Sequence, residues 1–358
     1  MEQRLRMFEG LLPEYADSAL IISNENRRYF TDFVSSLGYL LVTRKGSFLL
    51  VDFRYGEAAK KNAKNCTVIT FTNLGNTLKE LIQKYYLRDI MLEGSAFTLN
   101  QTESIEGFIK SAGASVIKSS ELDKIISRMR IIKTADEVDK IRHAQSITEE
   151  ALSETLPLIK EGVTERDLAL ELEYKMRKMG ADGVSFDLIV ISGKKTSMPH
   201  GVPDNNKIKA GDFITFDIGA TVDGYHSDMT RTVALGGVDD YQMRVYNTVL
   251  QAQLNALDAV CDGVTCNFVD NAARSYISQA GFDGCFGHST GHGVGLEIHE
   301  SPSVAPKNDF VLHNGMVITI EPGIYIPDKF GVRIEDMVVV TKDGCINLAT
   351  MPKELVVL

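Results

Sequence analysis

The sequence lacks the disulfide-type cysteine pattern of small secreted proteins and the long apolar runs of membrane-spanning chains. Its five cysteines include no pair with the two-residue spacing of a zinc knuckle, which favours free buried thiols in a reducing compartment. No run reaches the ~18 apolar residues of a membrane span, and the opening MEQRLRMFEG lacks an apolar signal core. We therefore expect a cytoplasmic protein with no membrane partner.

Positive charge is also scarce. Lys and Arg total 38 against 48 Asp and Glu, so the net charge is −10. This balance argues against nucleic acid as the main partner, because such binding depends on basic side chains that neutralise phosphates. It suits a protein that gathers carboxylates around bound cations. The 358 residues, 44% hydrophobic and 24% charged, are enough for one large globular domain or two ordinary ones.

The first third of the chain has the pattern of a small α/β domain. Short apolar runs, bounded by Gly, Asn or charges, predict strands in SALIIS, GYLLVT, SFLLVDF, DIMLEG and ASVIKS. Helical spacing appears between some of them, in TLKELIQKYYL and SIEGFIKSAG. All seven histidines lie at position 143 or later, so no metal or proton chemistry is expected here. We place this domain at residues 1–128.

The remaining residues, 129–358, mix long helices with many strands. Thr134 followed by Glu137 indicates a capping box at the start of a helix, and a second helix is expected from Thr164 to Met179. Helical runs also cover 241–261 and 267–279. Two long early helices imply a sheet for them to cover, and DLIVIS, DFITFDIGATV, YHSDMTRTVAL, MVITIEPGIYI and VRIEDMVVVT supply its strands. The predicted fold class is α+β.

One predicted hairpin, in FDIGATVDGYHSDMTRT, carries two aspartates. Asp223-Gly224 between alternating runs is a strong turn signal, because Gly accepts the positive φ of a tight turn. A turn centred there sets Asp217 opposite Thr230, with Asp228 as its diagonal neighbour on the same face. Aspartate is disfavoured inside strands, and two on one face would repel. A cation between them removes the problem.

A second hairpin, in TIEPGIYIPDKFGVRIED, repeats this pattern with glutamates. A loop centred near Asp328 sets Glu321 directly opposite Glu335, an arrangement that destabilises a sheet unless something neutralises the charges. A single strand acid is more often merely exposed on an edge, but two hairpins with paired acids favour metal binding. Carboxylates with one imidazole suit Mn²⁺, Fe²⁺, Co²⁺ or Zn²⁺, and two bridged ions suit hydrolysis.

The stretch GHSTGHGVGLEIHE contains three histidines. His288 and His292 have the four-residue spacing of a zincin, but the glycines around them make a poor helix, and His299 has no partner four residues on. The glycines do not complete a dinucleotide fingerprint either. In an extended chain one face would be bare and would permit close approach of another backbone or a ligand. His292 would then project into a site from the other face; the bare face consists of Gly291, Gly293 and Gly295.

These motifs, in this order, resemble the pita-bread metallopeptidase family, which contains methionine aminopeptidases, Xaa-Pro aminopeptidases and Xaa-Pro dipeptidases (prolidases). The likeness covers about residues 130–358, and all five metal-ligand positions match in type and order. YFTDF and DFRYGEAA near the N-terminus resemble, more weakly, the creatinase-type N-terminal domain of the Xaa-Pro branch. The resemblance implies a C-terminal pita-bread catalytic domain and an N-terminal domain that dimerises and walls the cleft.

The resemblance also implies a dinuclear metal site, most simply with two Mn²⁺ ions, although Co²⁺, Zn²⁺ or Fe²⁺ would fit. Asp217 would chelate one ion, and Asp228 and Glu335 would bridge the two. His292 and Glu321 would complete the second ion. Glu321 would also accept the proton of the bridging water.

Four further positions match substrate-facing groups of the family. His200 would face the substrate, and His299 would hydrogen-bond the scissile carbonyl or its tetrahedral successor. His288 would lie near the proline side, and Arg333 would support the site from behind the ligands. The side chains left without a catalytic role are Glu297, Glu300, His143, His226 and His313.

The implied activity is removal of an N-terminal residue that precedes proline, by a metal-bridging hydroxide, as in an Xaa-Pro aminopeptidase. The alternative is an Xaa-Pro dipeptidase, and a homodimer is expected in both cases. Methionine aminopeptidases usually lack the long N-terminal domain, and creatinase lacks the metal ligands. A non-catalytic pita-bread binding protein would have lost ligands, all five of which this chain retains.

Overall fold

The computed structural model describes the backbone of residues 2–358 and the side chains from residue 4 onward. The chain divides into two compact units at Met129/Arg130. Over the described residues, no helix is long and apolar enough to cross a membrane. Each unit has its own hydrophobic core.

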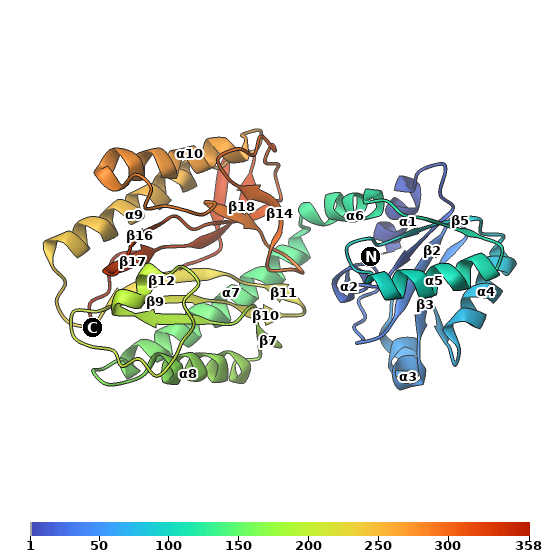
Figure 1. Ribbon diagram of the computed structural model, residues 1–358, viewed down its shortest axis with the longest axis horizontal. Coiled ribbons are helices and arrows are strands. Elements are labelled where there is room, and N and C mark those ends of the chain that lie inside the picture. The colour runs from blue at the N-terminus through green and yellow to red at the C-terminus, as the bar shows by residue number, and fades with distance from the viewer. Residues whose placement is uncertain (1) are drawn as a thin grey trace. The chain divides into compact units, whose positions relative to one another are not determined.

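The first unit is built on one mixed sheet of six strands in the order β4-β3-β2-β1-β5-β6 (Figure 1). The strands are β1 (Ser18–Ile21), β2 (Tyr39–Thr43), β3 (Gly46–Val51), β4 (Thr67–Thr70), β5 (Asp89–Leu92) and β6 (Ser115–Ile117). The helices are α1 (Glu2–Leu11), α2 (Asn24–Thr31), α3 (Phe53–Asn62), α4 (Leu74–Tyr85), α5 (Leu99–Ser111) and α6 (Glu121–Ile131), which contains the division point. The five predicted strands and two predicted helices are present. Edge strand β4, which has no buried residue, is an additional strand that was not predicted.

The second unit begins with two helices, α7 (Ala135–Thr155) and α8 (Glu165–Lys178), each started by a capping box. The box of Thr134 and Glu137 is the predicted one, and α8 follows its cap Thr164 as expected. The other pair is α9 (Asp240–Ala259) and α10 (Cys266–Ile277). Figure 1 shows the two helix pairs on opposite sides of the strands. The strands therefore form an inner layer that is covered on both faces.

The inner layer consists of antiparallel sheets. The first seven strands are β7 (Gly183–Val184), β8 (Ile189–Ser192), β9 (Phe213–Ile218), β10 (Ala220–Val222), β11 (Tyr225–His226), β12 (Met229–Ala234) and β13 (Gly291–Gly293). The remaining strands are β14 (Glu300–Val304), β15 (Val317–Ile320), β16 (Gly323–Ile326), β17 (Phe330–Arg333), β18 (Asp336–Thr341) and β19 (Gly344–Asn347). The sheet orders are β11-β10-β7, β12-β9-β8, β14-β13-β15-β18-β19 and β16-β17.

Two cores hold this layer in place. Side chains of α7 and α8 pack with β8 and β9, whereas side chains of α9 and α10 pack with β15, β17 and β18. The predicted turn at Asp223-Gly224 joins β10 to β11, and both residues have positive φ, 49° and 74°, as a type I′ turn requires. The site described below lies between these cores.

Candidate active site

Alternation along β9 decides where its aspartate points. Ile214 and Phe216 pack in the core with α7 and α8, so Asp217 between Phe216 and Ile218 lies on the opposite face of the strand. Asp217 pairs with Thr230 of β12, which confirms the predicted register. The strand thus presents one carboxylate to the space between the two helix pairs.

The glutamates of the second hairpin lie at a break in its ladder. Ile320 pairs with Asp336 on one side of the break, and Gly323 pairs with Arg333 on the other. Both pairs keep the predicted register, in which Glu321 faces Glu335. Because the ladder is interrupted there, the two glutamates are not spaced as an ordinary cross-strand pair and can turn toward a common centre.

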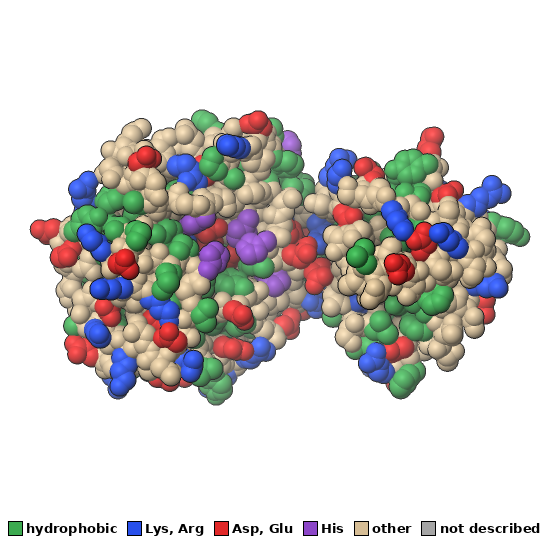
Figure 2. Space-filling model, viewed as in Figure 1, with side chains coloured by type: hydrophobic (Ala, Val, Ile, Leu, Met, Phe, Trp, Pro, Cys, Tyr) green, Lys and Arg blue, Asp and Glu red, His purple; other side chains and the backbone are tan. Residues whose placement is uncertain are grey.

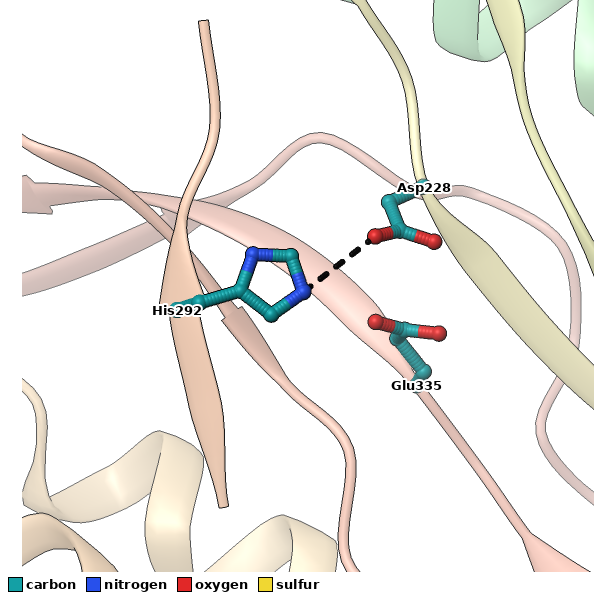
Figure 3. Close-up of side chains that lie close together, drawn as sticks. All are labelled: Asp228, His292 and Glu335. Atoms are coloured by element: carbon teal, nitrogen blue, oxygen red, sulfur yellow. Dashed lines mark ion pairs between the residues drawn. The ribbon is translucent and has the colours of Figure 1, made fainter. Parts of the chain in front are cut away.

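The carboxylates of Asp228, Glu321 and Glu335 lie close to one another, beside the ring of His292. Ligand atoms of Asp228, His292 and Glu335 all lie within 4.8 Å of one another (Figure 3). His292 Nε2 lies 3.5 Å from Asp228 Oδ2 and 3.5 Å from Glu321 Oε1. Asp228 is 4% exposed and Glu335 2% exposed, and they directly precede strands of different sheets, β12 and β18. The fold therefore buries several carboxylates together around one imidazole.

This grouping is electrostatically unfavourable without a cation. Burial raises the pKa of Asp228 well above its usual value, and the charges of Asp217 and Glu321 raise it further. Burial, then the neighbouring carboxylates, raises the pKa of Glu335 in the same way. The pKa of Glu321 is raised to about 8, chiefly by burial. Like charges about 4 Å apart repel by about 4 kcal/mol at an effective dielectric of about 20, so these carboxylates can be ionised together only if a cation balances their charge.

The tautomer of His292 fits a ligand role. Its Nδ1 lies 3.1 Å from its neighbour's carbonyl oxygen, Gly293 O, and donates a hydrogen bond to it. The lone pair of Nε2 then faces the carboxylates. Burial lowers the pKa of the ring to about 4, so it is neutral at physiological pH, as metal binding requires. Carboxylates with one neutral imidazole are a donor set for Mn²⁺, Fe²⁺, Co²⁺ or Zn²⁺.

Asp217 is held differently from the other acids. Its Oδ2 accepts a hydrogen bond of 2.6 Å from Arg333 Nη2, in an ion pair that is almost fully buried on the arginine side. The same guanidinium donates to Thr230 Oγ1, 3.1 Å away, and Thr230 donates to Glu335 Oε2 at 2.7 Å. Arg333 therefore supports two of the predicted ligands at once, one directly and one through a hydroxyl.

A further hydrogen-bond chain joins Arg333 to His288. Arg333 Nη1 donates to Tyr325 Oη at 2.8 Å, and Tyr325 Oη lies 2.9 Å from His288 Nε2. His288 Nδ1 donates to Ser289 O, so Nε2 accepts the tyrosine proton. Burial lowers the pKa of His288 to about 4, which keeps the ring neutral and able to accept. The histidine is thus oriented from behind by a tyrosine and an arginine.

The predicted site residues share one cavity of about 710 Å³. Figure 2 shows histidine side chains gathered on one face of the second unit. His200 and His299 also line the cavity, and the ring of His299 lies edge-on to His292 with 4.4 Å between centroids. Its lining includes all of the predicted side chains, namely His200, Asp217, Asp228, His288, His292, His299, Glu321, Arg333 and Glu335.

The glycines of the histidine-rich stretch allow close backbone contacts, as predicted. A Cβ on Gly291 would collide with the carbonyl oxygen of Thr319, and one on Gly293 would collide with that of Ser301. Thr319 also accepts a 3.1 Å hydrogen bond from the backbone nitrogen of His292. The bare face thus lets neighbouring strands lie close enough to fix the position of the His292 backbone.

Buried carboxylates also hold two of the histidine loops. Glu165, fully buried, accepts from Ser192 N at 2.7 Å and from Asn206 Nδ2 at 3.0 Å, which closes the loop that carries His200. Asp270 binds the guanidinium of Arg274, which donates to the carbonyl oxygen of His288 at 2.7 Å; the arginine–carboxylate contact is 2.8 Å. Each loop is therefore fixed at its base.

Sequence reasoning missed several residues at this site. The one sequence signal for Tyr325 is the glycine two residues before it. A Cβ on Gly323 would lie 2.5 Å from the phenol oxygen of Tyr325. Thr230 is opposite Asp217 in the predicted register, so its contact with Glu335 could have been considered. Asp187 lines the cavity from the segment before β8, and nothing in the sequence pattern around it indicates that position.

Comparison with known proteins identifies the family. The model of metallopeptidase family M24 matches residues 139–342, and that of the creatinase/prolidase N-terminal domain matches residues 11–132. The chain belongs to metallopeptidase family M24. It is therefore a metal-dependent peptidase, and its two parts are the expected creatinase-type domain and α+β pita-bread domain.

Similar proteins match over the whole length. An Xaa-Pro dipeptidase of Pyrococcus horikoshii is 35% identical over 360 residues, which cover 99% of both chains. The structure of an Xaa-Pro dipeptidase from Bacillus anthracis has a TM-score of 0.93 at 38% identity, covering 100% of this chain and 99% of its own. An X-Pro aminopeptidase structure from Thermotoga maritima has a TM-score of 0.92 at 35% identity, covering 99% and 100%. These relatives comprise Xaa-Pro dipeptidases and an X-Pro aminopeptidase, which are the two activities considered from the sequence.

Proposed function

We propose that this M24 peptidase hydrolyses the peptide bond before proline in Xaa-Pro dipeptides. The sequence motifs alone favour an Xaa-Pro aminopeptidase, with the dipeptidase as the alternative. The relatives reverse that order, because Xaa-Pro dipeptidases of two Pyrococcus species, 35% and 36% identical, match almost the entire chain. The observation that carries the proposal is the buried carboxylate–imidazole group that faces a 710 Å³ cavity.

Five side chains would hold two divalent ions: Asp217, Asp228, His292, Glu321 and Glu335. Such ions polarise the scissile carbonyl and lower the pKa of water, which is the chemistry that peptide hydrolysis at neutral pH requires. Mn²⁺ remains the expected metal. Chelation should abolish activity and Mn²⁺ should restore it, whereas full activity in metal-free protein would exclude this site.

The chain's own groups would bind the substrate and move its protons. Glu321, at the cavity wall beside His292, would accept the proton of the attacking water. His299 would donate to the carbonyl oxygen as negative charge develops on it. His200 would face the substrate from the loop closed by Glu165, and His288 would line the proline side.

The first unit is assigned a role only by the family resemblance. We propose that residues 1–128 dimerise the protein and wall the cleft, and that the protein acts as a homodimer in the cytoplasm. Light scattering of the purified chain tests the dimer directly. A monomer with full activity would contradict the cleft-wall role.

One observation favours Xaa-Pro aminopeptidase as a second candidate. A dipeptide presents its carboxylate next to the scissile bond, and a dipeptidase gains specificity by pairing it with a cation. Among the described residues that line the cavity, Arg333 is the sole arginine or lysine, and Asp217 and Tyr325 already bind it. A peptide that continues beyond proline would need no such partner.

A substrate panel separates these activities. Xaa-Pro dipeptides, Xaa-Pro-Yaa tripeptides, longer Xaa-Pro peptides and Met-Ala-Ser should be compared by kcat/KM with Mn²⁺ present. The dipeptidase proposal expects cleavage of the dipeptides and much weaker cleavage of longer peptides. Preference for the longer Xaa-Pro peptides would support the second candidate, and cleavage of Met-Ala-Ser alone would exclude both.

A further inference from the structure

Glu300 occupies the inside of the hairpin that carries two site histidines. Strands β13 and β14 pair with an irregularity after His292, and the six residues 294–299 connect them. The Glu300 carboxylate accepts a 3.2 Å hydrogen bond from Glu297 N within this connection. It also packs on Gly295, where a Cβ would lie 2.7 and 2.8 Å from its two oxygens. The side chain thus fills the loop that ends at His299.

Two cations from the start of the second unit hold this carboxylate. Arg130 donates to Glu300 Oε1, and Lys133 Nζ donates to Oε2 at 3.0 Å. The side chains of Arg130, Lys133 and Glu300 are 7%, 2% and 7% exposed. Burial alone would raise the pKa of Glu300, but Lys133 and Arg130 outweigh it and lower that pKa. The carboxylate is therefore charged and anchored at both oxygens.

The position of His299 depends on this anchor. His299 directly precedes Glu300, lines the cavity and lies edge-on to His292 at 4.4 Å between ring centroids. No hydrogen bond is formed by its ring among the described residues. Apart from the ring contact with His292, its orientation then comes from the backbone on either side, and Glu300 ties that backbone to two buried cations.

We propose that Glu300 is a positioning residue: clamped by Arg130 and Lys133, it fixes the 294–299 connection so that His299 faces the reacting carbonyl. This rests on the proposed function in its use of His299 as the carbonyl partner. The motif alone makes Glu300 a bystander, because its two cations lie about 170 residues away in sequence.

Glu297 provides a matched comparison within the same loop. It also pairs with Arg130, at 2.8 Å, but its side chain is 54% exposed against 7% for Glu300. A Glu297→Gln variant removes one negative charge from the 294–299 connection and leaves the buried contacts of Glu300 with Arg130 and Lys133 in place. It should leave kcat, KM and metal content unchanged.

A double-mutant cycle tests whether Glu300 acts through His299. Glu300→Gln should lower kcat by about 10-fold or more, change KM less than about twofold and retain metal. If Glu300 serves only to place His299, the Glu300→Gln/His299→Ala variant should be no slower than His299→Ala. Losses that multiply, or unchanged kcat in Glu300→Gln, would overturn the proposal. Should Glu300→Gln not fold, Lys133→Gln takes its place in the same cycle.

Hydrogen exchange of the metal-free protein gives a readout that needs no activity. Amides of residues 294–299 should exchange faster in Glu300→Gln than in the unsubstituted protein, and should not change in Glu297→Gln. Equal exchange in all three proteins would overturn the clamp. If the unsubstituted enzyme cleaves no Xaa-Pro peptide, the proposed function fails while the exchange result still decides whether Glu300 holds the connection.

Discussion

The two units each bury a glutamate, in opposite electrostatic settings. Glu93 of the first unit is 1% exposed and accepts hydrogen bonds from Ile22 N at 2.7 Å and Ser23 N at 2.9 Å, besides Asn26 Nδ2. Glu335 of the second unit is 2% exposed, has one hydroxyl donor and faces other carboxylates. Equal burial therefore does not indicate equal purpose. A satisfied carboxylate joins segments of a fold, whereas one placed among like charges creates a demand for a cation.

Removing a proposed metal ligand should have the largest effect. Glu335→Ala takes away the carboxylate that we propose to bridge the two ions, so we expect kcat/KM to fall at least about 10³-fold and metal content to drop. Activity assays and elemental analysis measure the two effects. Glu161→Gln, an exposed acid of the same unit, is the control and should match the unsubstituted enzyme. Normal metal content in Glu335→Ala would contradict the difference drawn between Glu93 and Glu335, because Glu335 would then not help to hold a cation.

Removing the satisfied carboxylate should affect stability instead. Glu93→Ala leaves the partly buried backbone N–H groups of Ile22 and Ser23 without an acceptor, which should lower the free energy of unfolding by about 2–4 kcal/mol. Urea denaturation measures this loss, and calorimetric titration should show unchanged metal affinity. Glu103→Ala, an exposed acid on α5, should change neither quantity. Weakened metal binding in Glu93→Ala would mean that the two kinds of burial are not independent.

In the metal-free protein, a substitution at Glu335 should raise the free energy of unfolding, whereas Glu93→Ala lowers it. Glu335→Gln removes a carboxyl group whose ionised form is disfavoured by burial and by neighbouring carboxylates, while its amide oxygen can still accept from Thr230. We expect it to raise the unfolding free energy of the metal-free protein by about 1 kcal/mol and to lower that of the metal-loaded protein. Thermal unfolding with and without chelator distinguishes the two. A loss of stability in both forms would contradict the repulsion between these carboxylates.

The smallest effect on stability is expected from Glu300, as a change in how the free energy of unfolding depends on pH in acid. Its pKa is lowered by Lys133 and Arg130 acting against burial, so the unfolded chain binds its proton first as pH falls. The stabilisation is complete above the ordinary value of 4.5 and is lost as pH falls through the lower native pKa. Unfolding free energies measured from pH 7 downward should therefore fall less steeply below about pH 4.5 in Glu300→Gln than in Glu297→Gln. Identical slopes would show that Lys133 and Arg130 do not stabilise the charged carboxylate of Glu300.

Local patterns predicted much of this architecture. The Asp223-Gly224 turn and the Asp217–Thr230 register follow from alternation and turn chemistry, which act over a few residues. Tyr325 and Glu300 could not be placed in this way. Their partners His288 and Arg130 lie 37 and 170 residues away and meet them only after the strands pack.

The ion pair between Arg333 and Asp217 bears on whether the chain can fold before it binds metal. An arginine keeps its proton at any physiological pH, so one of the clustered carboxylates has a counter-charge from the moment the strands come together. Burial and mutual repulsion raise the pKa values of Asp228, Glu321 and Glu335, which favours their protonated forms in the metal-free fold. We therefore expect the metal-free chain to fold before it binds metal, and metal binding to release protons.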